Sequence, residues 1–256
     1  PEQRGHQVIE RLAVVGAVAF AILVPAVQAL TDWGQSAAEF SADGNSTLRA
    51  AGYAFSIWSV IYAGLVVYAI YQILPRRAEP ALLAAVGWPS VVAAFGCGLW
   101  IIASAADLDW ASVAIILTSA GAMVFGLARA QAAGLGQTGW PRRSVLWPLG
   151  LLAGWLTAAA ALNILTVLTA KGLIGPDSAQ TAALAGVVGV TAAALIGAMI
   201  VRVGAYGLAV GWGLAAVAVA EAGPKPLVAL TALAAAAVVL GVSLVLALRH
   251  PRSYRA

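Results

Sequence analysis

The chain has 256 residues, of which 62% are hydrophobic and 9% are charged, with a formal net charge of +4. This composition excludes a soluble globular domain, and apolar runs of roughly 17 to 25 residues, the length that crosses a bilayer, recur along the whole chain. The basic residues are spread over short loops rather than gathered in one patch, which excludes a nucleic-acid-binding surface.

Breaks at charged residues, Pro and Gly predict eight transmembrane helices. In chain order they cover residues 9–30, 53–74, 81–104, 111–131, 146–169, 181–202, 204–221 and 227–248. No segment remains that could fold as a soluble domain, so we expect an all-α, polytopic transmembrane helix bundle with residues 1–256 as a single membrane domain. We expect the first helix to be retained rather than cleaved as a signal peptide, with Pro1 following a removed Met.

The distribution of basic residues predicts the orientation of the bundle, because cytoplasmic loops are enriched in Lys and Arg. If the N-terminus is cytoplasmic, eight spans place the C-terminus there too, and 11 of the 14 basic residues then face the cytoplasm. These are Arg4, Arg11, Arg76, Arg77, Arg129, Arg142, Arg143, Arg202, Arg249, Arg252 and Arg255. Only Arg49, Lys171 and Lys225 fall outside.

The longest loop, residues 31–52, lies outside in this topology and is rich in polar and turn-forming residues. We expect it to cover an outward-facing cavity. Small residues dominate several helices, as in "GLLAG" (residues 150–154) and "GLAVG" (residues 207–211). They favour close packing of helix backbones, which in lipid replaces the hydrophobic effect as the force that joins helices.

The nine tryptophans divide by depth. Trp33, Trp110, Trp140 and Trp147 fall at helix ends, where an amphipathic ring anchors in the headgroup layer. Trp100, about one turn below the outer surface, fits either an anchor or a deeper role. Four lie within predicted spans, where an indole N–H needs a partner or a cavity. These are Trp58, Trp88, Trp155 and Trp212.

The second helix, "YAFSIWSVIYAGLVVYAIYQ" (residues 53–72), is unusually rich in aromatic residues. Its helical spacing places Phe55, Trp58 and Tyr62 on one face. This face either packs against neighbouring helices or lines a ligand pocket. Residues 68–72, near the cytoplasmic end, are expected to be an interfacial anchor.

The fifth helix supplies a second unusual face, with Trp155 and Ala159 on one stripe and Asn163 at its edge. An amide in the hydrocarbon layer is costly unless it is hydrogen-bonded, so Asn163 either bridges helices or lines a site. Asn163 and Trp58 each lie about five residues from the outer end of their helices, which places both at similar depth in the outer half of the bilayer.

The chain offers few groups for catalysis or metal binding. His6 and His250 are terminal, and Cys97 is the single cysteine, so no haem, zinc or magnesium ligand is expected within the membrane. Glu221 is the one carboxylate that could reach into the bilayer, and its position at a helix end favours a solvated side chain. We therefore expect no enzyme activity and no covalent or metal cofactor.

Two motifs carry a family resemblance. "YAFSIWSVIYAGL" resembles the second-helix signature of the tryptophan-rich sensory protein family (TspO/MBR, translocator-protein-like), with Trp58 and Tyr62 matching in spacing. "WLTAAAALN" is similar to the family's Trp-x-x-Phe-Ala-x-x-Leu-Asn in the fifth helix, with Ala158 in place of Phe. "GWPSVVAAFG" is loosely similar to the third helix through Trp88.

The resemblance covers residues 9–170, and the helices within 181–248 exceed the usual five, as in the longer bacterial form. It implies a non-enzymatic sensory or regulatory protein of the bacterial cytoplasmic (inner) membrane, associated with photosynthesis. A pocket among the helices would bind a planar apolar ligand, such as a tetrapyrrole (porphyrin), a carotenoid or other isoprenoid, or a lipid. The candidate ligand-binding residues are Phe55, Trp58, Tyr62, Trp88, Trp155, Ala159 and Asn163.

An alternative function is that of a structural accessory subunit in a larger membrane protein complex, such as a photosynthetic pigment-protein assembly. The Ala- and Gly-rich faces of the three added helices would then dock on partner helices, membrane lipids or a second copy in a homodimer. A small-molecule transporter ranks lower, because the spans lack the intramembrane charges and paired broken helices that transporters usually carry.

Overall fold

The computed structural model describes residues 2–74 and 79–248 of the chain. These residues form helices without strands, and eight of the described helices are long and apolar enough to cross a membrane. The predicted all-α polytopic bundle of eight helices is therefore confirmed. The long helices are α1 (Glu2–Thr31), α3 (Ile57–Ile73), α4 (Pro80–Ala105), α5 (Asp109–Ala132), α7 (Trp147–Ala170), α8 (Ala179–Val201), α9 (Gly204–Glu221) and α10 (Pro226–Leu248).

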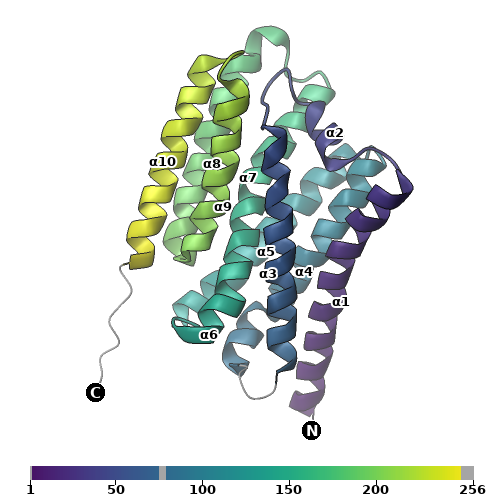
Figure 1. The fold of residues 1–256 in the computed structure, drawn as a ribbon, viewed down its shortest axis with the longest axis vertical. Coiled ribbons are helices and arrows are strands. Elements are labelled where there is room, and N and C mark those ends of the chain that lie inside the picture. Colours follow the sequence, from purple (N-terminus) through teal and green to yellow (C-terminus); the bar gives the residue numbers. More distant parts are fainter. Residues whose placement is uncertain (1, 75–78, 249–256) are drawn as a thin grey trace.

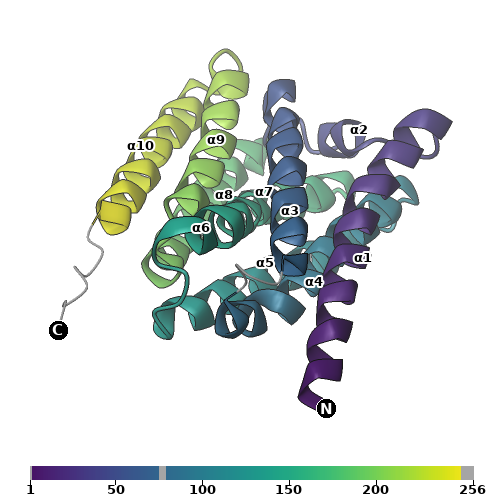
Figure 2. The same ribbon diagram turned by 60° about the horizontal axis from the view of Figure 1, so that its bottom comes forward.

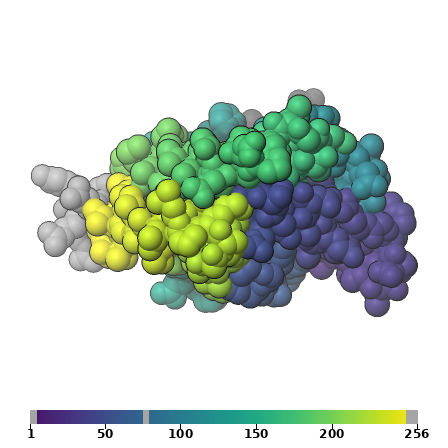
Figure 3. Space-filling view, turned by 90° about the horizontal axis from the view of Figure 1, so that it is seen from above, coloured from purple at the N-terminus to yellow at the C-terminus, as the bar shows by residue number. Residues whose placement is uncertain are grey.

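The two ends of the bundle differ. α1 begins and α10 ends at the same end, which we call the termini end (Figure 1). The opposite end carries residues 32–56, the cap segment, which contains the short helix α2 (Ala37–Ala42) and the 3₁₀ helix η1 (Gly52–Ser56). Seen from this cap end, the cap segment fills the space between the end of α1 and the turn that joins α9 to α10 (Figure 3).

The described basic side chains are divided between the two ends as the topology predicts. Arg49, Lys171 and Lys225 lie at the cap end. Arg11, Arg129, Arg142, Arg143 and Arg202 lie on the half of the bundle towards the termini end. Arg76, Arg77, Arg249, Arg252, Arg255 and the side chain of Arg4 lie outside the described residues.

The central helix of the bundle is α7, which packs on α3, α5, α8 and α9. It is preceded by the short helix α6 (Gly139–Pro141) and a π-helical turn, η2 (Arg142–Leu146), while the 3₁₀ turn η3 (Pro176–Ser178) leads into α8. Seen from nearer the termini end, α3 stands between α9 and α1 (Figure 2). Because α7 touches both early and late helices, it joins the two parts of the chain into one bundle.

The contact between α7 and α9 depends on the absence of a side chain at Gly154. A Cβ atom built there would lie 2.1 Å from the backbone oxygen of Tyr206, a distance that real Cβ atoms do not reach. Glycine therefore lets the two helix backbones meet directly, which is the packing that small residues provide in membrane bundles. The packing role predicted for "GLLAG" is found at this position.

One expectation about α3 is wrong. Residues 68–72 were expected to anchor at the membrane interface, but Tyr68, Tyr71 and Gln72 are buried inside the bundle. The hydroxyl of Tyr68 lies 2.8 Å from Ser90 Oγ on α4, within hydrogen-bonding distance. Composition and depth alone could not distinguish the two cases, because a helix that is apolar on all sides does not show which face its neighbours cover.

Candidate ligand-binding cavity

A cavity of about 90 Å³ lies in the half of the bundle nearest the cap end. Its walls come from α3, α4, α5 and α7 on one side and from α8 and α9 on the other, and residues of the cap segment line it at the cap end. One buried water needs roughly 10–15 Å³ on this measure, so the space exceeds what one water fills. Apolar side chains form most of the lining.

Two tryptophans from different helices meet at this cavity. Trp58 of α3 and Trp155 of α7 have ring centroids 6.3 Å apart and planes at 85° to each other, an edge-to-face pair. Tyr62 stacks on Trp58, with ring centroids 5.2 Å apart and an interplanar angle of 26°. Such pairs hold the rings at defined angles and contribute about 0.5–1.5 kcal/mol each beyond the burial of their area.

Asn163 both bridges helices and lines the cavity. Its Oδ1 accepts a hydrogen bond of 2.8 Å from Trp100 Nε1 of α4, and its Nδ2 donates one of 3.0 Å to Ser112 Oγ of α5. The side chain is buried and lies in the cavity wall. The two roles considered for this amide are therefore both present, since the hydrogen bonds that satisfy the amide also fix the position of Trp100.

The structure brings five of the seven candidate residues to the cavity. Phe55, Trp58, Trp155, Ala159 and Asn163 line it. Tyr62 does not line it but stacks on Trp58. Trp88 is 51% exposed and does not belong to the lining. The ligand-binding role of each of these residues stays a prediction.

Several lining residues had no distinguishing sequence signal. Phe40 of α2 packs edge-to-face on Trp100, with ring centroids 5.5 Å apart. Depth allowed a role for Trp100, but nothing singled out Phe40. Residues of α8 and α9 complete the opposite wall, and they are small or aliphatic and resemble their lipid-facing neighbours in type. Those wall residues are Gly186, Val187, Val190, Gly213, Leu214 and Val217.

The indole N–H of Trp155 has no hydrogen-bond acceptor among the described residues. The side chain is 6% exposed, so lipid and solvent do not reach it freely. A buried donor without a partner costs about 1–3 kcal/mol. This unsatisfied donor belongs to a residue of the cavity wall.

The expectation of a solvated Glu221 side chain is wrong. Its position at the end of α9 suggested a solvated carboxylate, but the side chain is fully buried. Its Oε1 accepts the backbone N–H of Arg49 at 2.7 Å, and its Oε2 lies 3.5 Å from Lys225 Nζ. The cap segment folds over this helix end and covers it, an arrangement that local sequence does not reveal.

The described residues include no cluster of His, Cys, Asp or Glu that could hold a metal ion. Cys97 is free and buried, and it lies in the cavity wall on α4. His6 lies on α1, and His250 is outside the described residues.

A protein-family model described as "TSPO-like protein" matches residues 10–245. The matched region includes α8, α9 and most of α10 as well as the helices that carry the two motifs. No curated protein and no solved structure matches the chain.

Proposed function

Because the chain belongs to the TSPO-like protein family, we propose that its cavity binds a planar apolar ligand, a tetrapyrrole or an isoprenoid such as a carotenoid. The observation that carries this proposal is the pair of tryptophans, Trp58 and Trp155, meeting at an apolar cavity between α3 and α7. Rings held at fixed angles offer both a face and an edge to a flat ligand. The protein acts as a sensor or regulator by binding, without catalysis.

The polar groups at the cavity favour a ligand that carries a hydrogen-bond acceptor. Trp155 Nε1 has no acceptor in the part of the chain that the structure describes, whereas Asn163 is engaged by Trp100 and Ser112. A carbonyl, carboxylate or ring nitrogen of the ligand would satisfy the indole N–H and recover the free energy lost by leaving it unpaired. Among the proposed ligands this favours a tetrapyrrole or an oxygenated carotenoid over a pure hydrocarbon.

The small size of the cavity means that the proposed ligand can bind only if the protein changes shape. The cavity volume of about 90 Å³ is well below the roughly 300–1,000 Å³ typical of sites for drug-sized ligands. A tetrapyrrole is at least of that size, so binding requires the walls or the cap segment to move apart.

The protein would work in a bacterial cytoplasmic membrane, with both termini cytoplasmic and the cap end outside. The charges of the described loops support this orientation, because Arg129, Arg142 and Arg202 lie towards the termini end and would face the cytoplasm under the positive-inside rule. The cavity would then open towards the outer leaflet, where the ligand would enter.

The proposal is tested by replacing Trp155 with Ala and titrating the purified protein with protoporphyrin IX, read by quenching of tryptophan fluorescence. A lost stacking contact of about 1–3 kcal/mol, by analogy with base–aromatic stacks, weakens the affinity about tenfold or more. Trp147→Ala is the matched control, since Trp147 lies on the same helix but is 43% exposed. Equal affinities of wild type and Trp155→Ala would overturn the proposal.

A second measurement separates this function from that of an accessory subunit. The absorbance spectrum of the gently extracted protein would show a bound tetrapyrrole or carotenoid directly. A stoichiometric partner protein in a colourless preparation would instead favour the structural role.

A further inference from the structure

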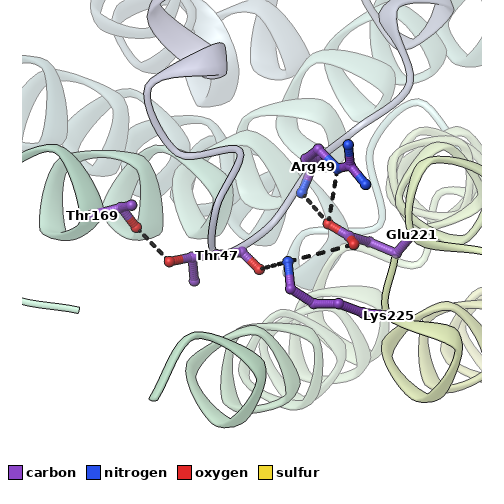
Figure 4. A network of polar contacts seen from close by, with 5 residues as sticks. All are labelled: Thr47, Arg49, Thr169, Glu221 and Lys225. Atoms are coloured by element: carbon purple, nitrogen blue, oxygen red, sulfur yellow. Dashed lines mark hydrogen bonds and ion pairs between the residues drawn. The ribbon is translucent and has the colours of Figure 1, made fainter. Parts of the chain in front are cut away.

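The cap segment is held to α9 at its 3₁₀ helix, where Trp212 Nε1 donates to the backbone oxygen of Ala54 at 3.0 Å. It is also held to α9 and α10 through residues 43–51, which we call the cap loop. The backbone N–H of Arg49 donates to Glu221 Oε1 at 2.7 Å, and Lys225 Nζ donates to the backbone oxygen of Thr47 at 2.8 Å (Figure 4). Just beyond, the N–H of Ala51 donates to the backbone oxygen of Ala216 on α9 at 3.0 Å. The loop is therefore held by helices that follow it by more than a hundred residues.

The centre of this attachment is a buried carboxylate between two cations. Glu221 is fully buried, with Arg49 Nε 3.7 Å from its Oε1 and Lys225 Nζ 3.5 Å from its Oε2. A buried charge is tolerated only when opposite charges and hydrogen bonds surround it, and removal of one partner leaves the others uncompensated. We call Glu221, Arg49 and Lys225 the ion cluster. Loss of one of its charges destabilises the other two.

The loop that the ion cluster holds is also the roof of the cavity. Leu48 and Ala50, the residues on either side of Arg49, both line the cavity. The other end of the cap segment is fixed separately, where Phe40 packs on Trp100. Because the cavity is too small for the proposed ligand, part of its lining has to move, and the cap loop is joined to the late helices by the polar contacts of Glu221 and Lys225.

We propose that Glu221 is a positioning residue of the ligand site: with Arg49 and Lys225 it latches the cap loop over the cavity, and release of this latch opens the cavity. What enters through the opening rests on the proposed function above. The closure itself does not, because the contacts that hold the loop are independent of any ligand.

The single cysteine of the chain provides a direct test. Cys97 is 5% exposed and lies in the cavity wall, so its thiol is protected while the roof is closed. The full-length protein is reconstituted in nanodiscs and treated with N-ethylmaleimide, and the labelled fraction is followed by mass spectrometry. Glu221→Gln, which keeps an acceptor for the Arg49 N–H but removes the charge, raises the labelling rate by about tenfold or more, because labelling tracks the population of the open form.

A matched control breaks another ion pair at the cap end. Lys171 pairs with Asp109 and joins α7 to α5 without touching the cap loop, so Lys171→Gln leaves the labelling rate unchanged. If Glu221→Gln does not fold, Lys225→Met, which removes the bond to Thr47, takes its place with the same expected increase. Labelling of either folded variant at the wild-type rate, or equal acceleration in Lys171→Gln, would overturn the latch.

Ligand kinetics then separate the latch from the ligand proposal. In stopped-flow mixing with protoporphyrin IX, Glu221→Gln raises both the association and the dissociation rate about tenfold and leaves the ratio of the two nearly unchanged, because an opened roof speeds both directions. If the wild type binds no protoporphyrin IX while Cys97 labelling still accelerates in Glu221→Gln, the ligand proposal fails and the latch stands. If the wild type binds protoporphyrin IX but Cys97 labelling does not accelerate in Glu221→Gln, the latch proposal fails and the ligand proposal stands.

Discussion

The two walls of the cavity are built on different principles. On the side of α3, α4 and α7, large side chains such as Trp58 and Trp155 occupy the wall, and Asn163 ties it together by hydrogen bonds. On the side of α8 and α9, the wall contains Gly186 and Gly213 with aliphatic neighbours. The first side, which we call the aromatic wall, offers rings and donors that can recognise a ligand, whereas the second, which we call the glycine wall, offers only small and aliphatic surfaces.

The largest loss of stability is expected at Gly154, where α7 and α9 meet. At Gly154 even Ala would place its Cβ 2.1 Å from the backbone oxygen of Tyr206, so α7 and α9 would have to separate. Overpacking of this kind costs about 3 kcal/mol or more when backbone has to move. The free energy of unfolding in mixed detergent micelles measures this loss for Gly154→Ala.

Gly189→Ala on α8 is the matched control for this substitution. Nothing lies within 4 Å of a Cβ at Gly189, and Ala is the better helix former, so stability is unchanged or slightly higher. Equal stabilities of Gly154→Ala and Gly189→Ala would show that the two walls are not held by direct backbone contact.

A smaller loss is expected when the hydrogen bonds of the aromatic wall are removed. Asn163→Leu leaves the indole N–H of Trp100 without an acceptor, which costs about 1–2 kcal/mol of unfolding free energy. The double variant Trp100→Phe/Asn163→Leu loses less than the sum of the two single variants, because the unpaired donor is then absent. Strict additivity would mean that the Trp100–Asn163 bond does not contribute to this wall.

The role of the glycine wall in ligand binding is tested by introducing a large side chain there. A Cβ at Gly213 would lie 3.3 Å from Ala158 Cβ and 3.7 Å from Trp155 Cζ3, so Gly213→Leu extends into the cavity beside the tryptophan. The affinity for protoporphyrin IX falls by about tenfold, equivalent to 1.4 kcal/mol, while the aromatic wall stays intact. Gly189→Leu is the control, and a tightly binding Gly213→Leu would show that the ligand does not use this side.

The smallest effect concerns the cap above the aromatic wall, where Ser36 and Glu39 form a capping box at the start of α2. The backbone N–H of Ser36 donates to Glu39 Oε2 at 2.7 Å, and this bond, followed by that with the Ser36 side chain, lowers the pKa of Glu39 below 4.5. A lowered folded-state pKa means that the stabilisation of α2 is present above the unfolded pKa and is lost as the pH falls through the folded pKa.

Amide hydrogen exchange measures this pH dependence. The protection of the Ser36 amide, corrected for intrinsic rates, decreases as the pH falls below the unfolded-state pKa of Glu39 and through its lower folded-state pKa. In Glu39→Gln the same protection does not change over this range. A wild-type protein with constant protection would contradict the role of the carboxylate.

Hydropathy was sufficient to predict the spans, because each of the eight has to cross the same thickness of hydrocarbon. Helical spacing predicted one face for Phe55, Trp58 and Tyr62, of which Phe55 and Trp58 line the cavity and Tyr62 does not. Neither principle shows which face of a uniformly apolar helix is covered. Trp88 lies in the first half of α4, towards the termini end, whereas Trp58 and the cavity lie towards the cap end, so Trp88 is outside the lining.

The other half of the cavity could not be predicted from the sequence for a different reason. Gly186 and Gly213 allow close packing on α7, because a Cβ there would lie 2.5 Å from Leu165 Cδ1 and 3.3 Å from Ala158 Cβ. A glycine in a membrane helix looks the same in the sequence whether it faces a cavity, a neighbouring helix or lipid. The burial of Glu221 depends on the cap loop, which is 172 residues away along the chain. A partner so distant in the chain cannot be predicted from the residues that neighbour Glu221 in the sequence.

The same separation of 172 residues between Arg49 and Glu221 also determines when the cavity is completed. Ribosomes add roughly 5–20 residues per second, so the cap loop emerges about 9–34 s before its acidic partner is synthesised. Throughout this interval the cap loop lacks the Glu221 carboxylate that binds it in the folded protein. The cavity therefore gains its α9 wall and the contacts that hold its cap loop only when the hairpin of α9 and α10 enters the bilayer.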